Sequence, residues 1–274
     1  MTIGTSRRTA LVTGASSGIG AIYADRLAKR GHDLVLVARN AARLDALAER
    51  LREETGRRVE VVAADLGDSG QLLGVEQLLR TREDISLLVN NAGIGAVAPL
   101  LQSDVAAMEA MINLNVNALT RLTYAAVPGF VSRGTGTIIN ISSVVAVYPE
   151  LLNGVYGASK AFVLALTQSL QHELSDKGIR IQVVLPGATA TEFWGIAGLP
   201  HENLPQEIVM GAEEMVDAAL SGWDLGEVVT VPALQDGAGW DRFDALRRDL
   251  APLLSLSSAA PRYKAHSAPA HSDL

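Results

Sequence analysis

The sequence predicts an α/β fold built on a doubly wound parallel sheet, and three features of the chain lead to that prediction. Short apolar runs alternate with longer helical patterns along most of the chain. The apolar runs are largely continuous, which is typical of strands buried on both faces. Glycine-rich or polar turns follow these runs, where ligands bind in open parallel sheets. The 274 residues show no internal repeat, so one domain is expected.

The expected strands and helices alternate, so the strands are expected to be parallel and joined by right-handed crossovers. Strands are expected at 9–12, 33–38, 59–66, 85–89, 136–141, 179–185 and 227–232. A helical pattern follows the first strand and its turn and continues to residue 27. Further helical patterns cover 41–54, 103–133, about 156–177, and 240–254. In 103–133, Asn115 and Asn117 are poor interior helix residues, so an amide bonded to the backbone or a water is expected to distort the helix.

The composition excludes several classes of protein. Hydrophobic residues make up 48% of the chain and charged residues 19%, which suits a folded core rather than disorder. A formal net charge of -7 argues against nucleic-acid binding, which usually needs a basic face. The chain has no cysteine, and no apolar run reaches the roughly 18 residues that cross a bilayer. We therefore expect a soluble, cytoplasmic protein that binds neither nucleic acid nor membrane.

A glycine-rich turn follows the first strand. Its spacing is Gly14-x3-Gly18-x-Gly20, which differs from the Gly-x-Gly-x-x-Gly of the common dinucleotide fingerprint. The glycines let the backbone approach a ligand closely, and the helix that follows offers free N–H groups to a phosphate. By itself such a turn can equally be a tight connection between strand and helix.

Charged residues at the ends of the next two strands bear on the choice of cofactor. In many dinucleotide folds an acidic residue at the end of the second strand binds the ribose hydroxyls. Here that strand ends in Arg39, with Arg43 one turn on. Because arginine can pair with a 2′-phosphate, NADP(H) is expected over NAD(H), unless Arg39 is a solvated loop charge. Asp65 could accept from an adenine amino group or cap the next helix.

The chemistry is expected at Tyr156 and Lys160, which share one face of a helix because they stand four residues apart. A phenol ionises near pH 10, and a nearby ammonium would lower the pKa of Tyr156 toward the working range. Ser143 follows the fifth strand and could place a hydrogen-bond donor beside the phenol. The competing interpretation is an ordinary exposed helical pair.

Several candidate residues follow strand ends, and in a parallel sheet these ends share one edge. Those features are the glycine-rich turn, Arg39, Asp65, Asn91, Ser143 and Pro186-Gly187. Asn90 and Asn91 are also expected to join neighbouring strands, and Gly93 lets a ribose pack against the backbone. Their coincidence on one edge favours an active site over scattered turns.

The later part of the chain is expected to form a lid and a tail. Residues 188–215 are irregular at first and contain five glutamates, while no lysine or arginine occurs between Arg180 and Arg242. We expect an apolar, electronegative lid that favours neutral substrates over carboxylates or phosphates. The domain is expected to end at 254, with 255–274 a mobile tail or an arm ordered by a neighbouring subunit. His266 and His271 lack the framework of a metal site, and none is expected.

Together these residues resemble the classical short-chain dehydrogenase/reductase family over about residues 8–232. The matching pieces are Thr13-Gly14-x3-Gly18-x-Gly20, Asn90-Asn91-Ala92-Gly93, Asn115, Ser143, Tyr156-x3-Lys160 and Pro186-Gly187 with Thr191. The resemblance implies a Rossmann-like fold and an NADP(H)-dependent oxidoreductase of the carbonyl reductase or alcohol dehydrogenase type. Its substrate would be an apolar ketone or aldehyde, or a secondary alcohol in reverse. Homodimers or homotetramers are usual in this family.

The resemblance also implies a role for each matching residue. Tyr156 would be the general acid that protonates the carbonyl oxygen, and Ser143 would donate a hydrogen bond to the same oxygen. Lys160 would bind the nicotinamide ribose and lower the pKa of the tyrosine. Asn115 would hold a water for proton relay. Cofactor contacts would come from Thr13, Gly14, Ser16, Ser17, Gly18, Ile19, Gly20, Arg39, Asp65, Leu66, Asn91, Ala92, Gly93, Tyr156, Lys160, Pro186, Gly187, Thr189 and Thr191.

Three alternatives remain open at this stage. Reduction of a 3-oxoacyl thioester uses the same chemistry, but the acidic lid argues against it. A dinucleotide-sensing protein would bind the cofactor without chemistry, and the presence of both Tyr156 and Lys160 argues against that function. A structural oligomer with vestigial binding is the third.

Overall fold

The computed structural model describes residues 8–264 of the chain. The chain divides into two compact units, the first ending at Ala233 and the second beginning at Leu234. The first unit contains the sheet and every candidate site residue. Within the described residues, no helix combines the length and the apolar character needed to span a bilayer.

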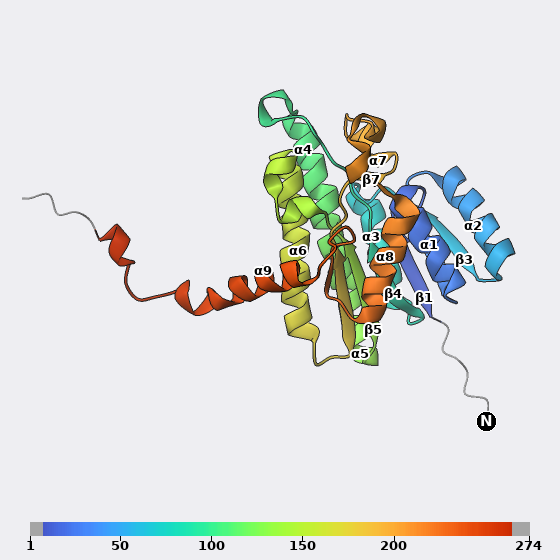
Figure 1. The fold of residues 1–274 in the computed structure, drawn as a ribbon. Helices are drawn as coiled ribbons and strands as arrows, with labels where there is room; N and C mark the ends of the chain where they lie inside the picture. Colours follow the sequence, from blue (N-terminus) through green and yellow to red (C-terminus); the bar gives the residue numbers. More distant parts are fainter. Residues whose placement is uncertain (1–7, 265–274) are drawn as a thin grey trace, which may run out of the picture. The chain divides into compact units, whose positions relative to one another are not determined.

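Seven parallel strands form the main sheet of the first unit, in the order β3-β2-β1-β4-β5-β6-β9 (Figure 1). Their bounds are β1 Thr9–Thr13, β2 Asp33–Ala38, β3 Val59–Ala63, β4 Ile85–Asn90, β5 Gly136–Ile141, β6 Ile179–Val184 and β9 Val229–Thr230. The strand order reverses between β1 and β4, and such a switch point opens a crevice for ligands at the carboxyl edge. The predicted doubly wound, Rossmann-like parallel sheet is therefore confirmed.

Helices cover both faces of this sheet, and each layer encloses its own apolar core. On one face lie α1 (Gly18–Lys29), α2 (Ala41–Thr55) and α8 (Ala212–Leu225). On the other lie α3 (Ser69–Thr81), α5 (Leu119–Arg133) and α6 (Gly154–Leu174). The strand side chains between them are almost all buried, which explains why the strands are continuous apolar runs.

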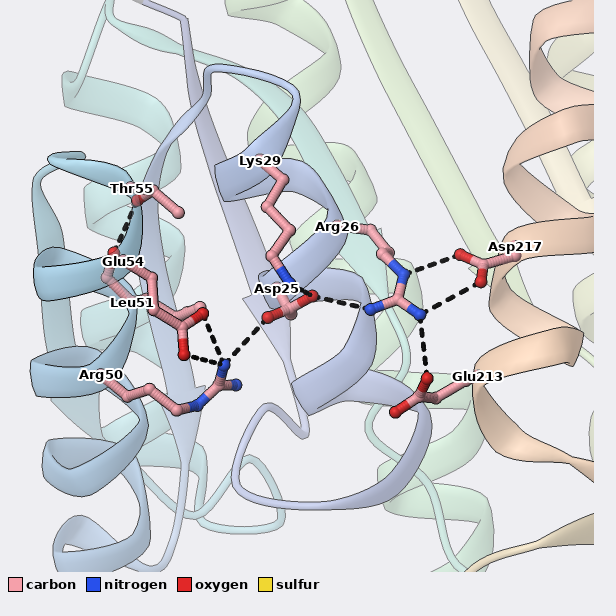
Figure 2. Close-up of polar contacts among 9 residues, drawn as sticks. All are labelled: Asp25, Arg26, Lys29, Arg50, Leu51, Glu54, Thr55, Glu213 and Asp217. Atoms are coloured by element: carbon pink, nitrogen blue, oxygen red, sulfur yellow. Dashed lines mark hydrogen bonds and ion pairs between the residues drawn. The ribbon is translucent and has the colours of Figure 1, made fainter.

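A polar network joins the three helices of the first layer (Figure 2). Asp25 of α1 is only 5% exposed and accepts from Arg26 and Lys29, both at 2.8 Å, and from Arg50 of α2 at 3.0 Å. Arg26 also donates to Asp217 of α8 at 2.7 Å. Burial acts to raise the pKa of Asp25, but the three cationic donors outweigh it and lower that pKa to about 2.

The third strand and the segment 103–133 differ from the sequence-based expectation, and the strand expected at 227–232 is limited to Val229–Thr230. The third strand ends at Ala63 rather than at 66, because Asp65 starts a turn in which its Oδ1 accepts from the Gly67 amide at 2.8 Å. The segment 103–133 is not one helix. It consists of α4 (Val105–Ile112), a π-helical segment η2 (Asn113–Ala118) and α5, so the expected distortion near Asn115 is confirmed.

The lid segment is closed at its base by a second, two-stranded sheet. The parallel strands β7 (Thr189–Ala190) and β8 (Met210–Gly211) pair, and the Met210 amide donates to the Ala188 carbonyl at 2.9 Å. Between them the chain forms α7 (Phe193–Ile196) and two single turns, η5 (His201–Asn203) and η6 (Gln206–Ile208). Residues 191–209 therefore form a loop that starts and ends beside the carboxyl end of β6.

Up to residue 264, the second unit contains α9 (Ala238–Asp249) and two short turns, η7 (Ala251–Leu253) and η8 (Pro261–Tyr263). The helix expected at 240–254 is thus shorter at its end. Trp240 and Phe243 pack with ring centroids 5.3 Å apart, and Arg247 bonds Asp244 at 2.7 Å. His266, His271 and the rest of the expected tail after 264 lie outside the described residues.

Candidate active site

Strand register brings most of the candidate residues to one edge of the sheet. Thr13 of β1 pairs with Val37 of β2, and Ile141 of β5 pairs with Val184 of β6. Because these parallel strands end nearly level, the turns after them open on the same crevice. The residues at 14–20, 39–43, 91–95, 142–146 and 185–191 therefore come from five adjacent strand ends.

Thr13 and Asn91 fasten the two strands at the switch point. The Thr13 hydroxyl accepts from the amides of Asn91 and Ala92, both at 3.0 Å, and donates to the Val89 carbonyl at 3.1 Å. The Asn91 side chain donates to the Thr13 carbonyl at 2.9 Å. A Cβ on Gly14, which has a φ of 65°, would lie 2.7 Å from the Asn91 amide nitrogen. These residues shape the glycine-rich turn and hold it beside β4.

Asn90 performs the expected joining of neighbouring strands on the other side of β4. Its amide donates to Asn140 of β5 at 2.9 Å and to Thr123 of α5 at 3.1 Å. Asn140 in turn donates to Thr167 of α6 at 2.9 Å. Since all four side chains are buried, this chain of bonds fixes β4 and β5 and the two helices over them.

The start of α1 fits the pyrophosphate of a dinucleotide. The helix begins at Gly18, its N-cap residue Ser17 forms no side-chain capping bond, and its first turn contains no acidic residue. The first amides of a helix have no intrahelical acceptor, so they remain available to an anion. Ser16 and Ile19 lie in the same turn. A Cβ on Gly18 would lie 3.3 Å from the Thr191 methyl group, so the segment after β7 passes close to this turn.

The end of β2 presents two exposed arginines. Arg39 is exposed and forms no ion pair with any residue of the described chain. Arg43 lies in the first turn of α2 and binds the carboxylate of Glu192 through both terminal nitrogens, at 2.6 and 3.2 Å. Two cations within one turn of the strand end suit a 2′-phosphate. Asp65 does not cap α3, whose N-cap residue is Asp68.

Tyr156 and Lys160 lie on the inner side of α6 and are buried, with 6% of each residue exposed. Asn153 caps the helix by accepting from the amides of Val155 at 2.9 Å and Tyr156 at 3.4 Å, which fixes the start of the helix beside the site. The Lys160 ammonium donates to the Ile141 carbonyl at 3.0 Å. The pair is therefore not an ordinary exposed helical pair.

Ser143 and Asn115 approach the same pair from other elements. Ser143 follows β5, and its hydroxyl donates to the Pro186 carbonyl at 3.3 Å and lies near enough to the Tyr156 hydroxyl to lower the pKa of the phenol. Asn115, in the π-helical segment, donates to the Ile94 carbonyl at 2.8 Å and to Ser159 at 3.1 Å. Its oxygen accepts from the Ile94 amide at 3.0 Å. Both amide hydrogens are used, so a relay water could bond only to the oxygen acceptors of Asn115.

The direction of the tyrosine pKa differs from the sequence-based expectation. Burial raises the pKa of Tyr156 to about 12, and the hydrogen bond with Ser143 lowers it only in part. Burial also lowers the pKa of Lys160 to about 8. The expectation counted the attraction of the ammonium alone, whereas enclosure of both groups penalises both charged forms.

An apolar wall surrounds the phenol. Met111, Val145 and Tyr156 form a buried cluster, against which Phe193 of the lid packs. The rings of Tyr156 and Phe193 have centroids 5.8 Å apart. A Cβ on Gly95 would lie 2.3 Å from the tip of the Phe193 ring, so the ring lies directly over the backbone at this glycine. Such surroundings suit an apolar group next to the reacting oxygen.

Sequence reasoning missed Gly95, Phe193 and the partner of Glu192. Phe193 was visible as an aromatic residue in the lid, but no pattern in the sequence pairs it with a glycine from another loop. Two further cofactor candidates lie apart from these contacts. Leu66 is buried in the core, and the Thr189 hydroxyl donates to the Gly187 carbonyl at 3.2 Å. The other cofactor candidates lie in the turns already described. The expected acidity of the lid is reduced, because Glu192 is paired.

The family model "short chain dehydrogenase" matches residues 8–197. Among curated proteins, a very-long-chain 3-oxoacyl-CoA reductase of Anas platyrhynchos is 38% identical over 67% of this chain, and a 17-beta-hydroxysteroid dehydrogenase type 3 of Danio rerio is 33% identical over 80%. These matches span 60% and 70% of the length of the two relatives.

Solved structures resemble the chain more closely. A short-chain dehydrogenase from Sphingobium yanoikuyae in complex with NADPH is 51% identical, with a TM-score of 0.91, and the match covers 94% of this chain and 100% of that one. A bulky-bulky ketone specific alcohol dehydrogenase from Comamonas testosteroni is 45% identical, with a TM-score of 0.87, over 95% and 100% of the two chains. With a family match over most of its length and this likeness in structure, the chain belongs to the short-chain dehydrogenase family of oxidoreductases.

Proposed function

We propose that this protein is an NADP(H)-dependent carbonyl reductase or alcohol dehydrogenase that acts on apolar ketones or aldehydes and on the corresponding secondary alcohols. The observation that carries the proposal is the buried Tyr156 hydroxyl, which lies near the Ser143 hydroxyl and is surrounded by apolar side chains. A substrate carbonyl in this position would meet two hydroxyl donors. Its hydrocarbon part would face Met111, Val145 and Phe193.

Each residue of the site then has a separate role in the reaction. The cofactor, when bound, supplies the hydride. Tyr156 donates its proton to the carbonyl oxygen, and Ser143 donates a hydrogen bond to the same atom, so that the developing negative charge is stabilised by donors already in place. Lys160 binds the nicotinamide ribose, while burial raises the pKa of Tyr156 and the nearby Ser143 hydroxyl partly offsets that rise. Asn115 holds the π-helical turn and a water for proton relay.

The choice of NADP(H) rests on the arginines after β2. Arg39 is exposed and Arg43 lies within one turn, and a guanidinium pairs with a phosphate but cannot accept from a ribose hydroxyl. The Sphingobium structure was solved with NADPH, and an archaeal alcohol dehydrogenase from Thermococcus sibiricus, 27% identical, was solved with 5-hydroxy-NADP. Both relatives support the same preference.

The substrate class rests on the wall around Tyr156 and on the Comamonas relative, which is specific for bulky-bulky ketones. A second candidate is the reduction of a 3-oxoacyl thioester, and it is favoured by the 38% identity to the duck 3-oxoacyl-CoA reductase. Both candidates require the same chemistry at the carbonyl. They differ in the rest of the substrate, which is neutral and apolar in the first and carries CoA in the second. We rank the neutral ketone first, because a CoA carrier needs several cations and the lid segment 188–215 contains none.

A substrate and cofactor panel tests the proposal. We would follow oxidation of NADPH and of NADH with aryl alkyl ketones of increasing size, with a ketone carboxylate and its neutral ester, and with 3-oxoacyl-CoA. The proposal predicts faster turnover with NADPH, and a higher kcat/KM for the neutral ester than for the carboxylate. Strong preference for the carboxylate would contradict the neutral-substrate class, and preference for 3-oxoacyl-CoA would establish the second candidate. Binding of both cofactors with no turnover on any carbonyl would indicate a sensor rather than an enzyme.

A further inference from the structure

Two neighbouring lid residues contact opposite ends of the candidate site. Glu192 accepts from both terminal nitrogens of Arg43, at 2.6 and 3.2 Å, although the two residues stand 149 positions apart in the sequence. The next residue, Phe193, packs its ring against Tyr156 with a centroid distance of 5.8 Å. One residue of the lid therefore contacts the arginine at the end expected to bind the cofactor phosphate, and the next contacts the phenol.

The position of the Phe193 ring depends on the glycine at residue 95. A Cβ on Gly95 would lie 2.3 Å from the ring tip and 3.1 Å from two further ring atoms, so only a glycine leaves room for the ring. The ring also packs edge-on against Trp194, at 5.8 Å between centroids, and Trp194 is 9% exposed. In this position Phe193 fills the apolar space beside the phenol, which is where a substrate carbonyl would have to enter.

The Arg43–Glu192 pair is weak enough to be exchanged. Its side chains are 50% and 58% exposed, and exposed ion pairs contribute little to stability. A phosphate monoester carries more charge than a carboxylate and has three strong acceptor oxygens, so it competes well for the same guanidinium. Once a phosphate binds Arg43, the Glu192 carboxylate beside it is repelled.

We propose that Glu192 and Phe193 couple the two ends of the site, so that a 2′-phosphate on Arg43 releases Glu192 and thereby frees the Phe193 ring from Tyr156. The proposal rests on the proposed function, since it takes Arg43 as a ligand of the 2′-phosphate. A cofactor with a free 2′-hydroxyl carries no charge at this point, so it leaves the pair intact and the ring in place. NADP(H) is then selected both by binding and by access of the substrate to the phenol.

Cofactor fragments separate this coupling from catalysis. The probe 2′,5′-ADP carries the 2′-phosphate without the nicotinamide, and 5′-AMP lacks the 2′-phosphate. Trp194 reports on the ring, because it contacts Phe193 directly. We expect 2′,5′-ADP to shift the tryptophan emission to longer wavelength, 5′-AMP to leave it unchanged, and Trp194→Phe to abolish the shift. Gly95→Ala supplies the reference spectrum for a displaced ring.

Variants of the ion pair complete the test. Glu192→Gln should show the shifted emission without ligand, and should bind 2′,5′-ADP more tightly by up to about fivefold, because the ion pair with Arg43 no longer has to be broken. Asp224→Asn is the matched control, since it removes another exposed two-point arginine pair, with Arg30, and it should behave as the wild type.

The outcomes distinguish the two proposals. Binding of 2′,5′-ADP to the wild type without any change in Trp194 emission would overturn the coupling and leave the proposed function standing. Equal affinity of the wild type and Glu192→Gln for 2′,5′-ADP would also overturn the coupling. Failure of 2′,5′-ADP to bind at all would reject the NADP(H) assignment, and the coupling with it.

Discussion

The Lys160 ammonium lies 5.8 Å from the centre of the Tyr156 ring, on the same side of α6, and both residues are enclosed by the protein. Lys160 uses one of its hydrogens on the Ile141 carbonyl, and the Tyr156 hydroxyl lies near Ser143. The lysine therefore has donors left for a ribose, and the phenol retains a proton to donate. This arrangement suits reduction of a carbonyl at neutral pH.

Tyr156→Phe should reduce turnover by roughly a thousandfold or more, because the general acid is removed and proton transfer typically contributes factors of that order. The ring is retained, so packing against Phe193 persists and the affinity for NADPH should change little. Steady-state kinetics and a cofactor titration on the same preparation check this. Turnover at the wild-type rate would show that another group protonates the oxygen.

The free energy of unfolding should depend on pH because Lys160 is buried. Burial lowers the pKa of Lys160 to about 8 from an ordinary value of 10.5, so between these two values the unfolded chain binds more protons than the folded one. Stability should therefore rise with pH from about 8 to 10.5. Lys160→Met has no such group and should lack this contribution. Urea unfolding of both proteins across this range measures the difference, and parallel curves would contradict it.

The sequence allowed prediction of the sheet and its functional edge, because each relies on a local pattern. Continuous apolar runs mark buried strands, and the turns after them carry Gly18, Arg39 and Ser143. The break at Asn115 was also predictable, because an amide inside a helix competes for backbone bonds. These features depend on residues close together in the sequence.

The features that were not predicted depend on distant residues. The ion pair between Arg43 and Glu192 joins segments that only the fold brings together, and so does the contact of the Phe193 ring with Gly95. The direction of the Tyr156 pKa was wrong for a related reason. Burial dominates that pKa, and burial is set by packing of the whole site rather than by the spacing of two residues.

Asp25→Asn should destabilise the protein at neutral pH by roughly 2 kcal/mol, because it removes a buried carboxylate whose pKa is lowered to about 2 by Lys29, Arg26 and Arg50. The contribution is complete above the ordinary value of 3.8 and is lost as the pH falls through about 2. The wild type and the variant should therefore become equally stable near pH 2. Chemical unfolding between pH 7 and pH 2 measures the gap, and Asp224→Asn is an exposed control.

A constant gap over that range would contradict this role for Asp25. It would mean that the network joining α1 to α2 stabilises the fold through shape and neutral hydrogen bonds rather than through the carboxylate charge (Figure 2). Loss of stability in Asp224→Asn of the same size and pH dependence would likewise argue against a specific contribution from the buried position.

With NADH, which leaves the Phe193 ring in place, Phe193→Ala should widen the range of accepted ketones. The ring occupies the space between Tyr156 and the backbone at Gly95, so its removal leaves room for a larger substituent beside the reacting carbonyl. The ratio of kcat/KM for a bulky ketone to that for a small one should rise by about tenfold, the scale of one or two methylene contacts. Phe162→Ala, on the exposed side of α6, should leave the ratio unchanged. With NADH, a ratio equal to the wild-type value in Phe193→Ala would show that the ring does not limit the space beside the carbonyl, and that the substrate wall is made of Met111 and Val145 alone.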